Sequence, residues 1–377
     1  MPHVFALPAQ RSLQATAFSR PRPNESFQPL PAPTGQPPFR MRLSDVVGDE
    51  AAARIEQQGR LTFHLAGDIG GVKDPKPQQV VALKMEEDLK ASAGTPGDPA
   101  FFYVVGDVVY FNGQARFYYD QFYYPYEHYD RPIVAVPGNH DGSPENSSVP
   151  SLQGFVNNFC APRPQVTPEA GDTPRTAMTQ PNVYWTLETP FATIVGLYTN
   201  VPEGGAVETD QQRWFAGELR DAPQDRALLV MLHHPPYSVD DHHSGSQAML
   251  ELIEQAVEET GRVPDAVFSG HVHNYQRFTR RRGDREIPFV VCGNGGYWHL
   301  HYVGKQPDGT DLPTPHPVQD DLTLEAYVDD HHGFVKLSVS RETLDGEFHR
   351  APRPQDSFRT PATITDRWSL DLARHRF

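Results

Sequence analysis

The chain has 377 residues, of which 38% are hydrophobic and 21% are charged, so it can form one large domain or two ordinary ones. Its 33 Lys and Arg against 48 Asp and Glu give a net charge of −15, which disfavours nucleic acid and anionic membranes as partners because their phosphates would be repelled. Two cysteines, Cys160 and Cys292, are too few for a disulfide framework, although one bridge between them would be compatible with the count.

The N-terminal segment differs in composition from the rest of the chain. Its first forty residues contain nine prolines and little periodicity, which predicts an extended arm. From Asp49 the pattern predicts a short helix that ends at Gly59. Because the chain shows neither a leader-like start nor eighteen consecutive apolar residues, we expect a cytoplasmic protein as written, or a secreted or periplasmic one if the sequence has been processed. We expect three units: the arm and helix (1–58), a catalytic domain (59–348) and a C-terminal extension packed on it (349–377).

Three short apolar segments each run into a polar loop that begins with or contains glycine. They cover residues 61–66, 101–105 and 133–136, and helical stretches at 78–90 and 114–129 separate them. Strands that alternate with helices predict right-handed βαβ units with a parallel sheet. The three polar loops should then meet at one edge of that sheet.

Later segments repeat this pattern and then depart from it. Residues 227–232 predict a strand that ends at His233, and residues 266–268 one that ends just before His271, with a helix at 246–259 between them. Residues 182–200, 288–293, 322–328 and 334–340 predict strands without intervening helices and hence a second sheet. The fold class is α/β, a two-sheet α/β/β/α sandwich with outer helices. Residues 142–181, rich in Pro, Ser and Thr, predict a long loop or lid.

The chemistry of the chain gathers at the strand ends. The polar residues there are Asp68, Asp107, Tyr110, Asn139, His140, His233, His271 and His273. Each motif alone has a plain structural explanation, since Gly-Asp and Asn are common in turns and a surface loop can hold two histidines. All of them in order at successive strand ends favour metal binding. Without His140, seven oxygen and imidazole donors exceed the four of one zinc site and predict two adjacent metal sites that share a carboxylate.

These blocks carry a family resemblance. The motifs are Gly67-Asp68-Ile69-Gly70, Gly106-Asp107-Val108-Val109-Tyr110, Gly138-Asn139-His140-Asp141, His233 and Gly270-His271-Val272-His273. Together they resemble the signature of calcineurin-like metallophosphoesterases and, more narrowly, that of purple acid phosphatases. The narrower resemblance rests on Gly70, where most of the superfamily has His, and on Tyr110, three residues after the second Asp. It covers roughly residues 61–340 and implies the two-sheet sandwich of that superfamily.

The resemblance also implies roles for individual residues. The ferric site takes Asp68, Asp107, Tyr110 and His273, with Asp107 bridging. The divalent site, for Fe, Zn or Mn, takes Asp107, Asn139, His233 and His271. His140 is expected to face the substrate phosphate, and His242 and His243 to orient the substrate and protonate the leaving group. Two departures are the missing N-terminal fibronectin-like domain of the plant members, and Asp141 where the family usually has Glu.

The expected function is that of a binuclear metal-dependent hydrolase, an acid phosphatase that cleaves small phosphomonoesters by attack of a metal-bound hydroxide, at acid pH and with broad specificity. No nucleic acid or membrane partner is expected, and the oligomeric state stays open. The alternatives are a phosphodiesterase of the same superfamily, against which Gly70 argues, a redox-active di-iron protein, and an inactive scaffold, against which the complete donor set argues. Among the other histidines, we expect His64 to be packed in its strand, whereas a role for His299 or His301 in the pocket stays open.

Overall fold

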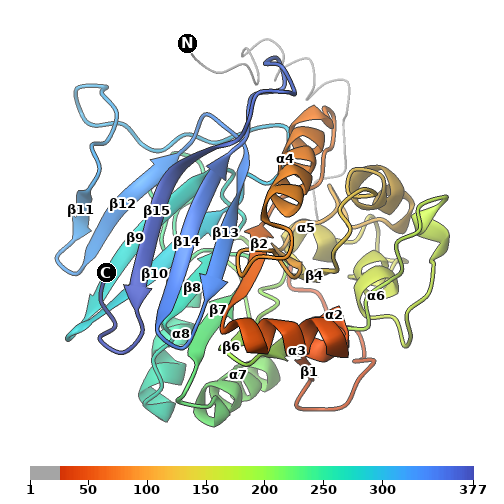
Figure 1. Cartoon of the computed structure of the whole chain (residues 1–377), viewed down its shortest axis with the longest axis horizontal. Helices are drawn as coiled ribbons and strands as arrows, with labels where there is room; N and C mark the ends of the chain where they lie inside the picture. The colour runs from red at the N-terminus through yellow and green to blue at the C-terminus, as the bar shows by residue number, and fades with distance from the viewer. Residues whose placement is uncertain (1–25) are drawn as a thin grey trace.

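The computed structural model describes residues 26–377, and the first part of the predicted proline-rich arm lies outside this range. Two β-sheets stack against each other and helices cover their outer faces (Figure 1). The predicted α/β sandwich of two sheets is confirmed. In the described residues, none of the helices combines the length and the apolar character needed to cross a membrane.

The six-stranded sheet contains the three predicted strands that precede polar loops. Its strands, in spatial order, are β15 (Thr363–Asp371), β14 (Thr343–Arg350), β13 (Gly333–Val339), β2 (Leu61–Ala66), β3 (Phe102–Val105) and β4 (Ile133–Val136). The last three are parallel, with Ala66 paired to Val104 and Val105 paired to Val136. Because these strands end at nearly the same level, the loops that follow them meet at one edge, as expected.

The nine-stranded sheet carries the later strands. In spatial order they are β1 (Arg40–Arg42), β5 (Trp185–Glu188), β6 (Ala192–Gly196), β7 (Ala227–Met231), β8 (Ala266–Ser269), β10 (Arg285–Cys292), β9 (Tyr275–Arg282), β12 (Leu322–Val328) and β11 (His316–Gln319). β6, β7, β8 and β10 run parallel to their neighbours in that series. The histidine loops that follow β7 and β8 therefore also meet at one edge.

The expected sorting of strands between the sheets was partly wrong. The segment at 334–340 does not join the other later strands, since β13 pairs antiparallel with β2. β7 and β8, which repeat the early strand-and-loop pattern, lie in the nine-stranded sheet. Alternation of apolar residues predicts a strand, but the choice of its neighbour depends on contacts far away in the sequence.

Most predicted helices lie within two residues of their expected bounds. They are α3 (Asp49–Gln58), α4 (Lys76–Ser92) and α8 (Gln247–Thr260). α8 and α7 (Thr209–Asp221) lie side by side and pack their apolar faces on the nine-stranded sheet (Figure 1). α4 packs on the six-stranded sheet, where Asp88 binds His64 of β2 at 3.0 Å and Lys336 of β13 at 2.8 Å. α2 (Leu43–Val47) precedes α3.

Residues 114–129 were expected to form one helix. They instead form a short 3₁₀-helix, Ala115–Phe117, and a short π-helix, Tyr119–Tyr123. Their rings pack into the core between this segment and α6 (Gln153–Phe159), for example Phe122 against Phe159 at 5.1 Å between ring centroids. Tyr118, Tyr123, Tyr126 and Tyr129 are fully buried. Such packing of bulky aromatic rings overrides the local helical tendency.

Residues 142–181 were predicted to form a long loop or lid. The segment contains a helix, α6.

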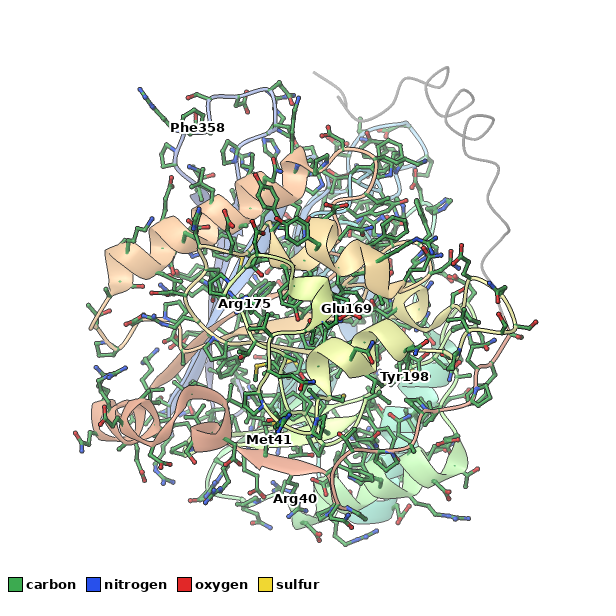
Figure 2. All side chains as sticks on the ribbon, turned by 90° about the vertical axis from the view of Figure 1, so that its right-hand side faces the viewer. Arg40, Met41, Glu169, Arg175, Tyr198 and Phe358 are labelled. Carbon is green, nitrogen blue, oxygen red and sulfur yellow. The ribbon has the colours of Figure 1, made fainter. Side chains whose placement is uncertain are left out.

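Both ends of the described chain form edge strands of the sheets. β1 pairs in parallel with β5, and its Arg40 forms an ion pair of 2.9 Å with Glu218 of α7, while the neighbouring Met41 is buried (Figure 2). β15 pairs with β14. The division of the chain at residues 58 and 348 stays a prediction. Cys160 and Cys292 are buried and free.

Candidate metal centre

Three residues at the centre of the site have a left-handed backbone. Asp68, Asp107 and His271 have φ angles of 56°, 54° and 68°, and each directly follows a glycine. This region is costly for residues other than glycine, and it occurs most often where a functional site holds a side chain in a required position. At Gly106, with φ of 97°, a Cβ would lie 2.2 Å from Nδ1 of His233, so only glycine lets the two loops approach.

Three predicted ligands form one compact group. Oδ1 of Asp68 lies 3.0 Å from the hydroxyl of Tyr110 and 3.3 Å from Nε2 of His273, and the hydroxyl lies 3.4 Å from the same Nε2. All three side chains are at least nine-tenths buried. Ligand atoms bound to one ion at about 2.0–2.2 Å lie roughly 3 to 3.5 Å from each other. The group therefore has the spacing of one coordination sphere.

The other predicted ligands form a second group. Oδ1 of Asn139 lies 2.9 Å from Nε2 of His233 and 3.1 Å from Nδ1 of His271. Oδ1 of Asp107 lies 3.5 Å from the same Nε2 of His233. Asn139 comes from the start of α5 (Asn139–Gly142), and the histidines follow β7 and β8. The edges of the two sheets thus bring together residues far apart in the sequence.

Asp107 is the carboxylate expected to be shared. One ligand atom each from Asp68, Asp107 and His233 lies within 4.8 Å of the others. Oδ1 of Asp107 accepts the backbone N–H of His140 at 2.9 Å, whereas the buried Oδ2 has no hydrogen-bond partner. A buried carboxylate oxygen without a partner is costly, and a bound cation would remove that cost.

Hydrogen bonds fix the tautomers of the three predicted histidine ligands. Nδ1 of His233 donates to the carbonyl of Val105 at 2.9 Å, and Nδ1 of His273 donates to that of His299 at 3.0 Å. His271 is reversed, with Nε2 facing the carboxylate of Glu203 at 3.3 Å. A nitrogen that donates to a carbonyl or carboxylate leaves the other nitrogen with its lone pair. All three rings therefore present a lone pair to the cluster, which is the arrangement seen in metal-binding histidines.

The electrostatics of the cluster favour a cation. Burial raises the pKa of Asp68 to about 6, an effect that the nearby histidines only partly oppose. Burial also acts on Asp107, but the charges of His233 and His140 outweigh it and lower the pKa of Asp107. Burial, followed by the charges of Asp107 and Asp68, raises the pKa of Tyr110 well above its usual value. These groups become anionic ligands together only if positive charge is supplied, as a metal ion does. The donor set therefore fits the predicted pair of metals.

The backbone at Gly70 packs directly against the ring of Tyr110, which leaves no room for a side chain at position 70. A Cβ at Gly70 would lie 2.8 Å from Cδ2 of Tyr110 and 2.6 Å from Oε1 of Gln121. Gln121 in turn accepts the backbone N–H of Tyr110 at 2.9 Å and donates to its carbonyl at 2.8 Å. A histidine at position 70 would collide with this arrangement, so the packing of Tyr110 and Gln121 requires glycine there.

The three histidines expected to act on the substrate lie around the cluster. His140 is half-buried, with Nδ1 donating to the carbonyl of Phe111 at 2.9 Å and its ring 4.6 Å from that of Tyr110. The ring of His243 lies 4.4 Å from that of His271. The exposed ring of His242 lies 4.7 Å from that of His243. All three line a cavity of about 600 Å³. The structure thus brings them to one side of the predicted ligands.

Glu203 is a residue that the sequence analysis missed. Its Oε1 lies 3.0 Å from Nδ1 of His243 and 3.3 Å from Nε2 of His271, so one carboxylate binds a predicted catalytic residue and a predicted ligand. Burial lowers the pKa of His243, but the hydrogen bond and charge of Glu203 outweigh it and raise that pKa. The missed signal was a Gly-containing polar loop after β6, as after the other strands.

Asp141 has a structural role that its sequence position left open. Its carboxylate accepts the backbone N–H groups of Val108 at 3.1 Å, Val109 at 3.0 Å and Gly138 at 2.9 Å. These bonds tie the loop after β4 to the loop after β3. Asp141 thereby fixes the backbone that carries Asp107 and Asn139.

The remaining histidines divide into packed and cavity-lining ones. His64 is fully buried and lies between Tyr129 and Asp88 at 3.0 Å from each, as expected. His299 and His301 line the cavity, together with Lys73, Asp241, His273, Tyr297, Trp298, Leu300 and Tyr302.

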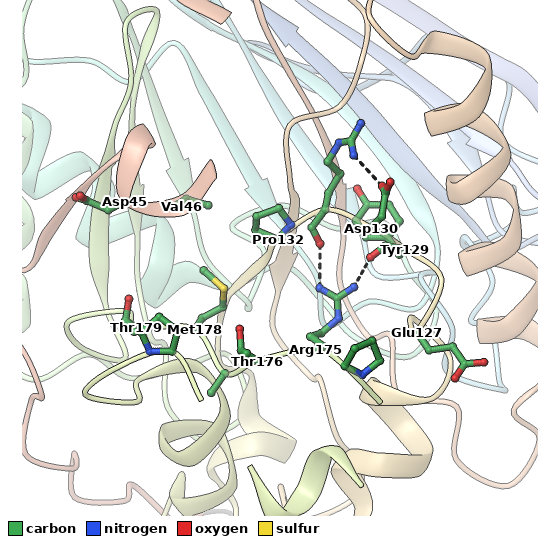
Figure 3. A pocket seen from close by; sticks show the side chains of 14 residues that line it. Asp45, Val46, Glu127, Tyr129, Asp130, Pro132, Arg175, Thr176, Met178 and Thr179 are labelled. Carbon is green, nitrogen blue, oxygen red and sulfur yellow. Dashed lines mark hydrogen bonds and ion pairs between the residues drawn. The ribbon is translucent and has the colours of Figure 1, made fainter. Parts of the chain in front are cut away.

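A second cavity, of about 480 Å³, is lined by none of the predicted site residues. There Arg175 donates to the carbonyl of Arg131 at 2.9 Å and to that of Tyr129, and so holds a loop in place (Figure 3).

Comparison with known proteins agrees with this geometry. The family model of calcineurin-like phosphoesterases matches residues 61–275, which is more than half of the chain. Purple acid phosphatase 22 of Arabidopsis thaliana is 31% identical over 124 residues, covering 30% of this chain and 27% of the relative. Purple acid phosphatase 21 of the same plant is 24% identical over 174 residues, covering 44% and 36%. The chain thus spans about a third or less of the length of these relatives.

A solved structure with a similar fold is that of purple acid phosphatase PPD1 from seeds of yellow lupin, Lupinus luteus. It superimposes with a TM-score of 0.56 at 15% identity and covers 83% of this chain and 54% of the lupin chain. The expected resemblance to calcineurin-like metallophosphoesterases, and to purple acid phosphatases among them, is confirmed.

Proposed function

Since the chain belongs to the calcineurin-like phosphoesterase family, we propose that it is a binuclear metal-dependent hydrolase of small phosphomonoesters, active at acid pH. The observation that carries this proposal is the orientation of His233, His271 and His273, each of which has its lone pair fixed toward the cluster by a hydrogen bond on the other nitrogen. Inert surface or core histidines have no need of this common orientation.

We further propose which residues hold the ions. Asp68, Tyr110 and His273 would hold a ferric ion, because a phenolate is a hard ligand that suits a trivalent centre. Asn139, His233 and His271 would hold a divalent ion, with Asp107 shared by both. Two such ions would acidify a water molecule, bind phosphate oxygens and stabilise charge on the attacking and leaving oxygens.

The surrounding residues would bind and orient the substrate and supply a proton. His140 is held by the carbonyl of Phe111 and faces the cavity, where it would bind the phosphate. His243 is a candidate general acid, because Glu203 raises its pKa and so favours the imidazolium that can protonate an alkoxide leaving group. A protonated acid is available only below its pKa, which supports activity at acid pH.

The cavity supports broad specificity for monoesters. Its volume of about 600 Å³ is much larger than a phosphate group, and its wall includes rings of Tyr297 and Trp298. Gly70, which lies against Tyr110, stands where most of the superfamily has a histidine. We therefore expect monoesters to be preferred over diesters.

The experiment combines elemental analysis, a visible absorption spectrum and kinetics on nitrophenyl phosphate and bis-nitrophenyl phosphate. We expect two metal ions per chain with at least one iron, a visible band from the phenolate-iron pair, and higher kcat/KM for the monoester at acid pH. Removal of the metals by a chelator should abolish turnover. Activity that persists with one metal ion or none would refute a binuclear centre, and preference for the diester would refute the substrate class.

A further inference from the structure

Three histidines form a second imidazole cluster in the wall of the cavity. His242 and His243 come from the loop after β7, and His301 comes from the loop after β10. Their ring centroids lie 4.7 Å apart for the pair His242 and His243, 4.7 Å for His242 and His301, and 5.2 Å for His243 and His301. One potential ligand nitrogen of each lies within 4.8 Å of the others.

Buried groups around the cluster hold its histidines in place. His301 is 8% exposed, and its Nδ1 has no hydrogen-bond partner. The side chain of Asp240 is fully buried, and its Oδ1 accepts the backbone N–H groups of His242 at 2.8 Å and His243 at 2.7 Å. Oδ2 of Asp240 is held by Asn274 at 2.8 Å. The backbone under both loop histidines is thus fixed, while the buried Nδ1 of His301 faces Oδ1 of Asp240 at 3.8 Å without a hydrogen bond.

The orientation of His243 leaves a nitrogen for this cluster. Its Nδ1 donates to the carboxylate of Glu203 at 3.0 Å, so Nε2 carries the lone pair whenever the imidazole is neutral, and zinc competes there with a proton. Three imidazoles without a carboxylate or thiolate are the ligand set of many zinc sites, which complete their sphere with water. Nitrogens bound to one zinc ion lie roughly 3.3 Å apart, and small side-chain rotations would bring the three rings to that spacing.

We propose that His242, His243 and His301 form a third cation site, suited to zinc and separate from the seven predicted ligands of the binuclear centre. The site adjoins that centre, since the ring of His301 lies 4.3 Å from that of His273. Zinc bound there withdraws His242 and His243 from the substrate. On the basis of the proposed function, excess zinc therefore inhibits hydrolysis of esters whose leaving group needs a proton.

The binding test uses the metal-loaded protein and zinc as the probe. Equilibrium dialysis against increasing zinc, followed by elemental analysis, should find one zinc ion per chain beyond the two metals already present. His301→Ala should lose this third ion and keep the other two. His128→Ala is the matched control, because His128 has a side chain 75% exposed and lies outside the cluster. It should still take up the third ion.

The second readout is inhibition. Each variant is compared with its own rate without added zinc. Excess zinc should reduce hydrolysis of glycerol phosphate by the wild type on the order of 10²-fold, the size of a lost general acid, and should have little effect on His301→Ala.

The outcomes separate this proposal from the proposed function. A wild type that holds two metals and takes up no third zinc ion overturns the third site and leaves the binuclear centre intact. A third ion that persists in His301→Ala overturns the assignment to this cluster. A chain that never holds two metals refutes the proposed function instead. In that case the third site would still be supported if the wild type took up a zinc ion that His301→Ala did not.

Discussion

The hydroxyl of Tyr110 donates a hydrogen bond of 3.0 Å to Oδ1 of Asp68, although 42 residues separate them in the sequence. In the absence of a cation this bond keeps the phenol protonated, and burial beside two carboxylates raises its pKa well above the usual value. A ferric ion held by these two residues would replace the proton. The contact therefore makes Tyr110 a candidate ligand that a substitution can test.

Tyr110→Phe removes the oxygen and keeps the ring. We expect the visible band to disappear, because it arises from charge transfer between phenolate and iron, while the fold remains intact by circular dichroism. Tyr297→Phe is the matched control, since its ring lies 4.3 Å from that of Tyr110, and it should keep the band. A Tyr110→Phe protein that retains its colour would show that Tyr110 is not a ligand.

Asp107→Ala and Asn139→Ala should differ in the metals they lose. Asp107 is expected to bind both ions, so its removal should lower the content of both metals and abolish nearly all turnover. Oδ1 of Asn139 lies beside His233 and His271 and is a neutral oxygen, so its loss should mainly release the divalent ion. Elemental analysis of both variants measures this difference. Equal loss of both ions in the two variants would rule out the shared role of Asp107.

The substrate histidines can be tested by the choice of leaving group. An alkoxide needs a proton, an effect worth roughly 10²- to 10⁴-fold, whereas nitrophenolate leaves without one. His140→Ala and the double variant His242→Ala, His243→Ala should therefore keep both metals and lose more kcat/KM on glycerol phosphate than on nitrophenyl phosphate. If every variant loses the same factor on both substrates between about pH 4 and 8, these residues only bind phosphate.

Glu203→Gln tests how the acid is positioned and charged. Glu203 raises the pKa of His243, so removal of its negative charge should lower that pKa. The protonated acid is then lost at lower pH, and the falling limb of kcat on glycerol phosphate should move to lower pH. Glu208→Gln makes the same charge change five residues along the loop and should leave the limb in place. An unchanged limb in Glu203→Gln would exclude His243 as the acid.

His64 predicts how the stability of the fold depends on pH. Burial lowers its pKa to about 4 from a usual value of 6.5, so the folded protein keeps it neutral while the unfolded chain binds a proton. Stability is therefore full above pH 6.5 and falls as the pH drops toward 4, by on the order of 3 kcal/mol for this group. His64→Gln removes this titration.

Urea unfolding at pH 7, 6, 5 and 4 measures the effect. The stability of His64→Gln should depend less on pH than that of the wild type. A residual dependence should remain, because the pKa of the buried His332 is also lowered to about 4. His128→Gln, at an exposed position, should match the wild type. Equal pH dependence in His64→Gln and the wild type would show that His64 does not titrate across this range.

The strands that carry the site, and the donors at their ends, follow from local sequence patterns. A short apolar run followed by Gly-Asp or Gly-Asn-His is a local pattern, and the rule that parallel strands end at one edge then places Asp68, Asp107 and Asn139 together. The structure follows these expectations at β2, β3 and β4. The resemblance to a known signature added roles for Tyr110 and the histidines.

Contacts between segments that are distant in the sequence depend on how the whole chain packs. Glu203 reaches His271 across 68 residues, and His301 reaches His243 from the loop after β10, so no local pattern shows which residues they contact. The pairing of β13 with β2 and the collision that keeps position 70 a glycine depend in the same way on packing. Local sequence sets the conformation of a segment, whereas its neighbours are chosen by burial and hydrogen bonding summed over the whole molecule. Packing of the whole chain brings the charge of Glu203 beside His243. It also gathers the imidazole cluster around His301.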